Sequence, residues 1–275
     1  MRTRVITAIV MVAAMVPFFI FSGTVAFPVL MALLGAVGVF EMQGCIGAKK
    51  PLAASLPPML VAAGIPFLVR YGKGDRFAYL FAIAFALIAY EMIVSVFSGK
   101  KFGVESAALS GAMGVYVAFG FAAVVMLRDL PYGEFIYFLT FIIPWVTDTF
   151  AYFSGRLFGK HKLIPEVSPK KTVEGSVGGT LFAVLLTVLY GFVIGKASEA
   201  APNYIALAVV ALAVSLLSQC GDLVMSLVKR RFGIKDYGKL FPGHGGVLDR
   251  FDSVVVTAPT LYFLTTLIPN FHLFS

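Results

Sequence analysis

Charged residues are scarce in this chain of 275 residues. Asp, Glu, Lys and Arg make up 13% of it, whereas soluble domains carry about 25%. Hydrophobic residues make up 59%, and the mean hydropathy is +0.92. This composition excludes an ordinary soluble domain. It predicts an all-α polytopic membrane protein with little mass outside the bilayer.

Cysteine and histidine are also rare. Cys45 and Cys220 lie far apart in the sequence, which excludes a disulfide framework, and we expect both to be reduced packing residues. The three histidines, His161, His244 and His272, are scattered, and neither cysteine has metal-ligand spacing. A transition-metal site is therefore not favoured.

Long apolar stretches dominate what is present. A membrane-spanning helix needs roughly 20 apolar residues. The basic start followed by an apolar stretch is like a signal peptide, but no small-x-small cleavage site follows, so we read it as the first span. Nine spans are predicted, at about 5–22, 25–42, 52–69, 77–97, 104–127, 133–154, 176–195, 203–221 and 253–273. We expect an N-terminal transmembrane part over 1–130, with about five spans, and a catalytic transmembrane region over 131–275.

Lys and Arg are distributed unequally between alternate loops. With the N-terminus in the cytoplasm, 17 of the 22 Lys and Arg residues fall on the cytoplasmic side and five on the other. This split follows the positive-inside rule. Two long loops, about 155–175 and 222–252, are then cytoplasmic, and they are the segments large enough for an active site on that side.

Acidic residues occur where spans meet these loops. Asp148 lies near the cytoplasmic end of the sixth predicted span, where an acid is functional unless it is paired structurally. If the eighth span continues as a helix, Ser218, Asp222, Ser226 and Lys229 share one face, with Arg230 beside it. This line suits a metal–phosphate surface, although a salt-bridged helix end would look similar.

Asp249 and Asp252 have helical spacing of three at the start of the last span. The simpler interpretation is negative charge favoured by the helix dipole. Carboxylates from separate helices, with phosphate between them, also match what Mg²⁺ requires.

Both loops carry residues suited to phosphate. Glycines around His244, in Pro242-Gly243-His244-Gly245-Gly246, allow close backbone approach to a ligand. In Ser168-Pro169-Lys170-Lys171-Thr172, Pro169 predicts a turn, and the lysines could hold phosphates as point charges. A plain positive-inside loop is the alternative for the second segment.

These residues resemble the signature of the phosphatidate cytidylyltransferases (CDP-diacylglycerol synthases). The longest matching run is Ser226-x2-Lys229-Arg230-x4-Lys235-Asp236-x5-Pro242-Gly243-His244-Gly245-Gly246-x2-Asp249-Arg250-x-Asp252. Two upstream runs match as well, Asp148-x3-Tyr152-x2-Gly155-Arg156-x2-Gly159-Lys160 and Ser168-Pro169-x-Lys171-Thr172-x-Glu174-Gly175. So does Gln219-x-Gly221-Asp222. The resemblance covers about 145–255, and the first half matches only in being apolar and of suitable length.

The resemblance implies that CTP and phosphatidate react to give CDP-diacylglycerol and pyrophosphate, with Mg²⁺, and it leaves open a second cation such as K⁺. It also implies a homodimer in a bacterial inner membrane, with an active site facing the cytoplasm, and we expect no nucleic-acid partner. Asp222 and Asp249 would be metal ligands. The resemblance further implies catalytic roles for Asp222, Asp249, Lys229, Arg230 and His244. The substrate-binding residues would be Asp148, Lys171, Thr172, Ser226, Gly243, Gly245, Gly246, Arg250 and Asp252.

We expect these side chains to line a polar cavity that is open to the cytoplasm and sideways to lipid, with walls from the sixth, eighth and ninth spans. Two alternatives remain. A CTP-dependent lipid kinase would use a similar membrane-embedded site. A transporter would spread its charges through the bilayer midplane.

Overall fold

The computed structural model describes residue 10 and residues 13–47, 52–98 and 102–275. Its long helices are α2 (Ala26–Ile46), α3 (Leu52–Tyr71), α4 (Arg76–Ser98), α5 (Val104–Arg128), α7 (Leu139–Phe158), α8 (Val173–Ala197), α9 (Tyr204–Arg231) and α10 (Leu248–Leu267). The short elements are α6 (Gly133–Ile136), β1 (Lys162–Ile164) and β2 (Ser168–Thr172). The chain is therefore an all-α membrane protein with one small hairpin.

Seven segments of the described chain are long and apolar enough to cross a membrane, namely α2, α3, α4, α5, the α6–α7 segment, α8 and α9. These correspond to the second to the eighth predicted spans. The first predicted span lies partly outside the described residues; of its described residues, 10 and 13–20 are helical and 21–22 form a turn. Helix α10 falls outside the seven, because three charged residues occupy its start. The total of nine spans stays a prediction.

Several predicted boundaries were wrong. Helix α9 continues about ten residues beyond the predicted end at 221, so Ser226, Lys229 and Arg230 lie on a helix and not in a loop. Helix α10 begins at Leu248 and ends at Leu267. It stops short of 273 because Pro269 and Asn270, which has a φ of 60°, follow it.

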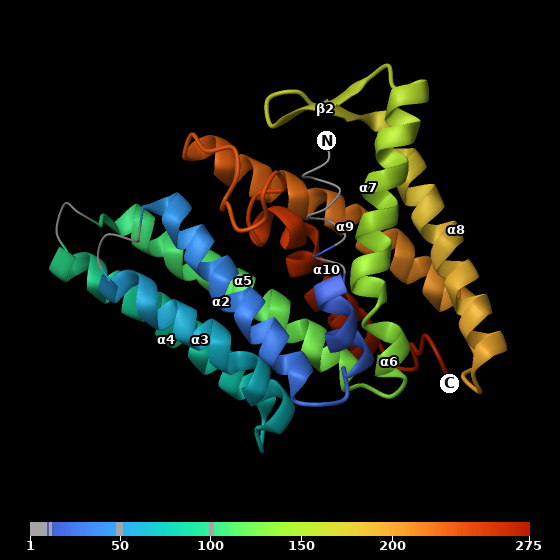
Figure 1. The fold of residues 1–275 in the computed structure, drawn as a ribbon, viewed down its shortest axis with the longest axis horizontal. Helices are drawn as coiled ribbons and strands as arrows, with labels where there is room; N and C mark the ends of the chain where they lie inside the picture. Colours follow the sequence, from blue (N-terminus) through green and yellow to red (C-terminus); the bar gives the residue numbers. More distant parts are fainter. Residues whose placement is uncertain (1–9, 11–12, 48–51, 99–101) are drawn as a thin grey trace. The chain divides into compact units, whose positions relative to one another are not determined.

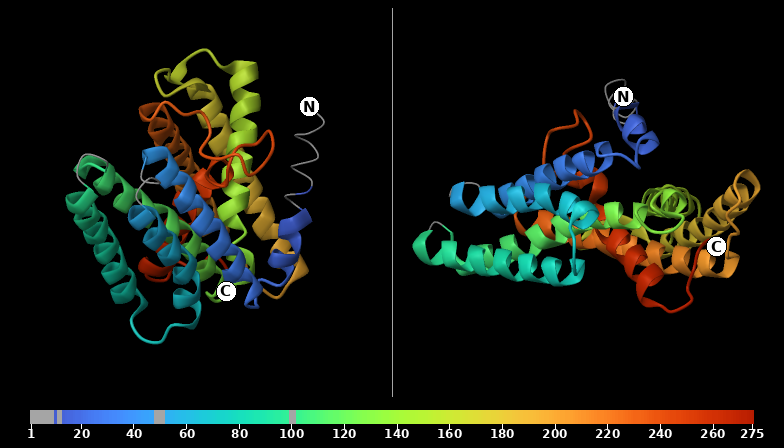
Figure 2. Two further views of the ribbon diagram at one scale, coloured as in Figure 1. Left: turned by 60° about the vertical axis from the view of Figure 1, so that its left-hand side comes forward. Right: turned by 90° about the horizontal axis from the view of Figure 1, so that it is seen from below.

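The described contacts divide the chain into two compact units. The first comprises Met1–Met126 and Arg231–Phe251. In it, α2 to α5 run side by side (Figures 1 and 2). Helix α3 stays continuous despite Pro57, Pro58 and Pro66, since backbone groups freed by proline in a membrane helix find other partners. At Gly38, α2 lies against Val117 of α5 and Leu248 of α10, where an added Cβ would lie 3.1 and 3.2 Å from their side chains.

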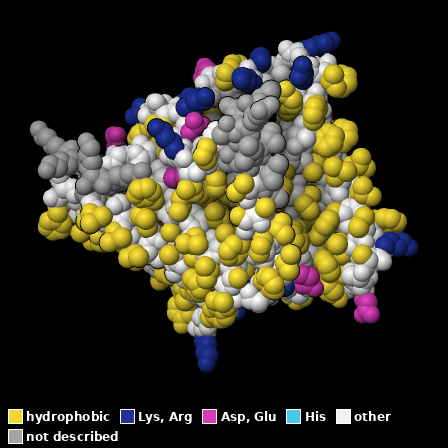
Figure 3. Space-filling view, viewed as in Figure 1, with side chains coloured by type: hydrophobic (Ala, Val, Ile, Leu, Met, Phe, Trp, Pro, Cys, Tyr) yellow, Lys and Arg dark blue, Asp and Glu magenta, His cyan; other side chains and the backbone are white. Residues whose placement is uncertain are grey.

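The second unit comprises Leu127–Arg230 and Asp252–Ser275. Helices α7 and α8 pack along their length, and the β1–β2 hairpin lies at one end of the pair (Figure 1). Hydrophobic side chains cover broad areas of the face shown in Figure 3, and Lys and Arg side chains gather at the hairpin end of this unit. This pattern is expected when helix sides face lipid and helix ends face water.

Candidate active site

Glycines allow α7 and α8 to approach closely at the hairpin end. A Cβ on Gly175 would lie 2.6 Å from the Ala151 carbonyl oxygen and 3.2 Å from the Cα of Gly155. A Cβ on Gly179 would lie 2.5 Å from the Thr147 carbonyl oxygen. Such contacts are too short for any side chain, so small residues are required here, as is common between membrane helices.

Thr172 caps the N-terminus of α8. Its backbone is extended, and its Oγ1 accepts a hydrogen bond of 3.1 Å from the N–H of Gly175. Threonine is a favoured N-cap because its oxygen satisfies an otherwise unpaired helical N–H. Thr172, a predicted substrate-binding residue, therefore also has a structural role.

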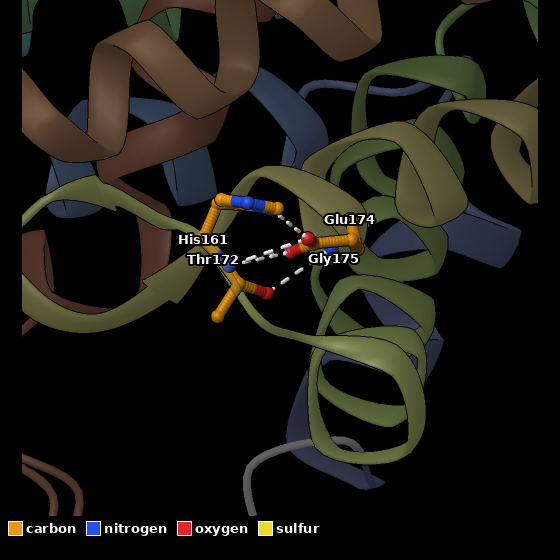
Figure 4. A network of polar contacts seen from close by, with 4 residues as sticks. All are labelled: His161, Thr172, Glu174 and Gly175. Carbon is orange, nitrogen blue, oxygen red and sulfur yellow. Dashed lines mark hydrogen bonds and ion pairs between the residues drawn. The ribbon is translucent and has the colours of Figure 1, made fainter.

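An acid–histidine pair ties the hairpin to α8 (Figure 4). The Glu174 carboxylate lies 2.6 Å from Nδ1 of His161, and both of its oxygens accept from the His161 backbone N–H at 3.2 Å. The two strands are antiparallel, pairing Lys162 with Thr172. The prediction of a turn at Pro169 was wrong, because this residue lies within β2; proline is compatible with an edge strand.

This arrangement brings Lys171 to Asp222 of α9. Lys171 Nζ lies 2.5 Å from Asp222 Oδ2, and both side chains are about one quarter exposed, at 26% and 24%. Asp148 of α7 interacts electrostatically with both. The ion pair therefore joins three segments that are distant in sequence.

Asp252 and Lys229 belong to the same cluster. Asp252, which is half-buried, interacts electrostatically with Asp222, Lys229 and Asp148. Its Oδ1 accepts a hydrogen bond of 2.8 Å from the Ser253 N–H. The second unit thus gathers three of the predicted acids and two of the predicted lysines. Ser226 follows Asp222 by one helical turn and is half-buried, while Arg230 is exposed.

A pocket of about 290 Å³ lies beside this cluster. It is lined by Asp148, Ala151, Tyr152, Gly155, Arg156, Leu163, Lys170, Lys171, Thr172, Gly175, Ser176 and Gln219. Its walls are α7, the hairpin, α8 and α9. The predicted cavity, with walls from the sixth, eighth and ninth spans, stays a prediction. This pocket is lined by α7 and α9, which correspond to the sixth and eighth spans, and not by α10, and it is also lined by the start of α8. The reason is the close glycine packing that brings the start of α8 against α7.

Buried hydroxyl and amide groups support one wall of this pocket. Thr147 Oγ1 of α7 lies 2.8 Å from Ser215 Oγ of α9, and Ser215 donates to Thr180 Oγ1 of α8 at 3.1 Å. Gln219 Nε2 donates to the same Thr180 oxygen at 3.0 Å. In apolar surroundings such bonds hold helices in a defined register.

The glycine-rich loop belongs to the first unit and forms a tight turn. The His244 N–H donates to the Phe241 carbonyl oxygen at 2.8 Å. Pro242 and Gly243 occupy the two central positions, and Gly243 has a φ of 78°. This arrangement is typical of a type II turn, which requires a residue that tolerates positive φ at its third position.

Asp249 shapes this loop from the first turn of α10. Its Oδ2 accepts hydrogen bonds from the N–H groups of Tyr237, at 2.8 Å, and Gly246, at 2.9 Å. The side chain is buried. Asp249 thus has a positioning role that the sequence did not indicate, and its role as a metal ligand stays a prediction.

A second hollow, of about 630 Å³, lies along this loop. It is lined by Lys235, Asp236, Gly238, Lys239, Phe241, Pro242, Gly243, His244, Gly245 and Arg250. Three cations and one carboxylate make it a basic surface, suited to anions. Gly246 is buried and does not line it. The predicted site residues thus form two groups, each within one unit.

Sequence reasoning missed several residues. Gln219, Tyr152 and Arg156 line the first pocket, although only their presence in the matching runs was noted. Glu41 of α2 was overlooked as well, although its carboxylate accepts hydrogen bonds from the backbone N–H groups of Val247 and Leu248. An acid within an apolar span is itself a signal of function or pairing, and that signal was available at Glu41. Cys220 was expected to be a packing residue, but it is exposed.

Comparison with known proteins shows the family of the chain. The chain is 34% identical over 277 residues to the phosphatidate cytidylyltransferase of Bacillus subtilis (strain 168), covering 97% of this chain and 98% of that protein. It is 34% identical over 270 residues to the protein of the same name from Staphylococcus haemolyticus, covering 96% and 98%. The family model described as the cytidylyltransferase family matches residues 2–268. The chain therefore belongs to the cytidylyltransferase family.

Proposed function

We propose that this chain transfers the cytidylyl group of CTP to phosphatidate, giving CDP-diacylglycerol and pyrophosphate. The observation that carries the proposal is the Lys171–Asp222 ion pair beside a pocket walled by membrane helices. A lipid phosphate needs cationic groups near water and apolar helix surface for its acyl chains. The names of the relatives support the same reaction.

The chemistry is a displacement at phosphorus. An oxygen of the phosphatidate phosphate attacks the α-phosphorus of CTP, a new P–O bond forms, and the bond to pyrophosphate breaks. The attacking phosphate is ionised near neutral pH, so no strong general base is required. Positioning and neutralisation of charge dominate such transfers. Lys171, Lys229 and Arg230 are the cations we assign to this task in the second unit.

The donor set fits Mg²⁺. Asp148, Asp222 and Asp252 influence one another electrostatically, and a hard cation prefers carboxylate oxygens. Among the described residues, no three His, Cys, Asp or Glu side chains form a metal-binding group on their own. This accords with an ion held by one or two carboxylates together with substrate phosphates. When bound, the ion would offset phosphate charge.

We assign Asp222 as the principal ligand, with Asp148 and Asp252 as neighbouring contacts. Asp249 is the second predicted ligand, and a further cation such as K⁺ stays a prediction.

The basic hollow of the first unit suits phosphate oxygens of CTP. Lys235, Lys239 and Arg250 supply charge there, and His244 can donate a hydrogen bond. The glycines on either side of His244 leave the backbone accessible to a ligand. We therefore assign Gly243, His244, Gly245 and Arg250 to the nucleotide phosphates.

The distribution of Lys and Arg supports a cytoplasmic active site, and the bacterial relatives support a location in a bacterial inner membrane. We also propose a homodimer, as the family resemblance implies.

The decisive experiment uses purified protein with labelled CTP and phosphatidate, with and without Mg²⁺. We expect Mg²⁺-dependent CDP-diacylglycerol and an equal amount of pyrophosphate. A phosphorylated lipid with release of CDP would indicate the kinase alternative. Absence of any product, together with substrate flux in liposomes, would indicate the transporter and contradict the proposal.

A further inference from the structure

A buried carboxylate from α2 holds the start of α10. Glu41 Oε1 accepts a hydrogen bond of 3.0 Å from the Val247 N–H, and Oε2 accepts one of 2.9 Å from the Leu248 N–H. Glu41 is only 5% exposed. A buried carboxylate is costly unless its oxygens are hydrogen-bonded, and here both are.

The position of this carboxylate suits its charge. The N-terminus of a helix carries partial positive charge and several N–H groups without helical partners. Val247 immediately precedes α10, and Leu248 is its first residue. Glu41 therefore acts as an N-terminal cap supplied by a distant helix, 206 residues earlier in the chain.

Two glycines of the loop make room for the Glu41 carboxylate. A Cβ added at Gly238 or at Gly246 would overlap its oxygens. Asp249 links the start of the loop to its end, because its Oδ2 accepts hydrogen bonds from the N–H groups of both Tyr237 and Gly246. Glu41 and Asp249 together hold both ends of the 237–248 segment.

That segment supplies most of the residues that line the basic hollow. His244 lies between the two anchored ends, and Arg250 follows the capped residues by two positions. We propose that Glu41 is a positioning residue for the reaction, because it fixes the loop that presents His244 and Arg250 to the phosphates of CTP. The assignment of this ligand rests on the proposed function; the anchoring contacts do not.

The test compares wild type with Glu41→Gln in detergent or nanodiscs. Glutamine has the same shape but only one acceptor oxygen, so its NH₂ group would face one of the two N–H groups. Glu105→Gln is the matched control, since Glu105 is an exposed acid in the first turn of α5 in the same unit. Should Glu41→Gln fail to fold, Glu41→Asp, which keeps the charge on a shorter side chain, is measured in its place.

Two readouts distinguish positioning from general stability. Hydrogen exchange in peptides covering 237–250 should accelerate by about tenfold in Glu41→Gln, with exchange in α3 unchanged, since one buried hydrogen bond is lost. The KM for CTP should rise by about tenfold, with the KM for phosphatidate unchanged, because the free energy of ordering the loosened loop would be subtracted from that of CTP binding, and tenfold in affinity corresponds to about 1.4 kcal/mol. Glu105→Gln should match wild type in both.

Unchanged exchange and kinetics in folded Glu41→Gln would overturn the proposal. So would uniformly faster exchange with an unaltered KM for CTP, since that result describes a purely structural residue. If exchange changes locally but wild-type protein makes no CDP-lipid, the anchoring by Glu41 stands, and the proposed reaction and the positioning role in it are both contradicted.

Discussion

Lys171 and Asp222 show how single residues create the chemistry of this molecule. Each would be poorly stabilised alone near the membrane, and together they form a 2.5 Å ion pair in which the Lys171 ammonium is buried although both side chains are about one quarter exposed. Ion pairs of this kind are weak contributors to stability when exposed. Their more important effect is to keep charge beside the pocket.

Asp222→Asn should reduce turnover by about a hundredfold or more, because it removes the charge that balances Lys171 and that we propose as the ligand of the cation. The variant should remain folded, with a wild-type elution profile in detergent. Rates are measured with labelled CTP over a series of Mg²⁺ concentrations. Glu199→Gln, an exposed acid elsewhere in the second unit, serves as the control. Near-normal rates in folded Asp222→Asn at all Mg²⁺ concentrations would rule out Asp222 as a ligand.

Helix α8 depends on the details of its first turn. Thr172 caps it, Glu174 binds His161, and Gly175 and Gly179 allow α7 to lie against it. The loop lysines reach the pocket because these contacts hold the hairpin in place. Local chemistry at one helix end therefore positions residues of the site.

Thr172→Ala should lower the thermal stability of the protein, because loss of an N-cap oxygen costs about 1 kcal/mol. Thr172→Ser keeps the oxygen and should stay near the wild-type melting temperature. Thermal unfolding in detergent, followed by circular dichroism, measures the difference. Equal melting temperatures for the alanine and serine variants would argue against the cap.

Gly175→Ala tests the packing of α7 on α8. The added methyl would meet the Ala151 carbonyl and the Gly155 backbone, so α7 and α8 must separate, at a cost of about 1–3 kcal/mol. In Gly64→Ala the methyl of a glycine within α3 enters open space, and this control should be neutral or slightly stabilising. Melting temperatures of the purified variants are compared. If Gly175→Ala is as stable as Gly64→Ala, the close approach is not required.

The molecule as a whole is organised by the membrane. Seven segments of the described chain are long and apolar enough to span it. The predicted site residues lie in loops rich in Lys and Arg and on α7, α9 and α10, with Asp148 and Asp222 ten and nine residues before the ends of α7 and α9. The positive-inside rule is the basis on which we propose a cytoplasmic site. A site on the cytoplasmic side would also be reached by CTP, which is dissolved in water.

Single cysteines placed by Glu166→Cys and Lys239→Cys, in a background lacking Cys45 and Cys220, test this topology. Both should resist a membrane-impermeant thiol reagent in intact cells and react after the cells are opened. Glu199→Cys lies in the opposite predicted set of loops and should react in intact cells. Labelling of position 166 or 239 from outside would show that the orientation is the reverse of the predicted one.

Several features were predictable from the sequence because they depend on local properties. Membrane-spanning helices follow from hydropathy, since a bilayer demands internal backbone hydrogen bonding over a fixed length. The seven helical segments that are long and apolar enough to span a membrane could be predicted without knowledge of tertiary contacts. The shared face of Ser218, Asp222, Ser226 and Lys229 was also predictable, because helical spacing alone determines it. The family resemblance rested on motifs that can be read directly from the chain.

Only the tertiary structure decided how these elements meet. The ion pair of Lys171 with Asp222 joins a hairpin to a helix about fifty residues away. The cap from Glu41 joins residues separated by 206 positions. No local pattern specifies such partners, because they depend on which helix faces pack and on where glycines allow close approach. For the same reason Asp249 was predicted from its charge and motif, while its hold on Tyr237 and Gly246 became visible only once the loop had folded around it.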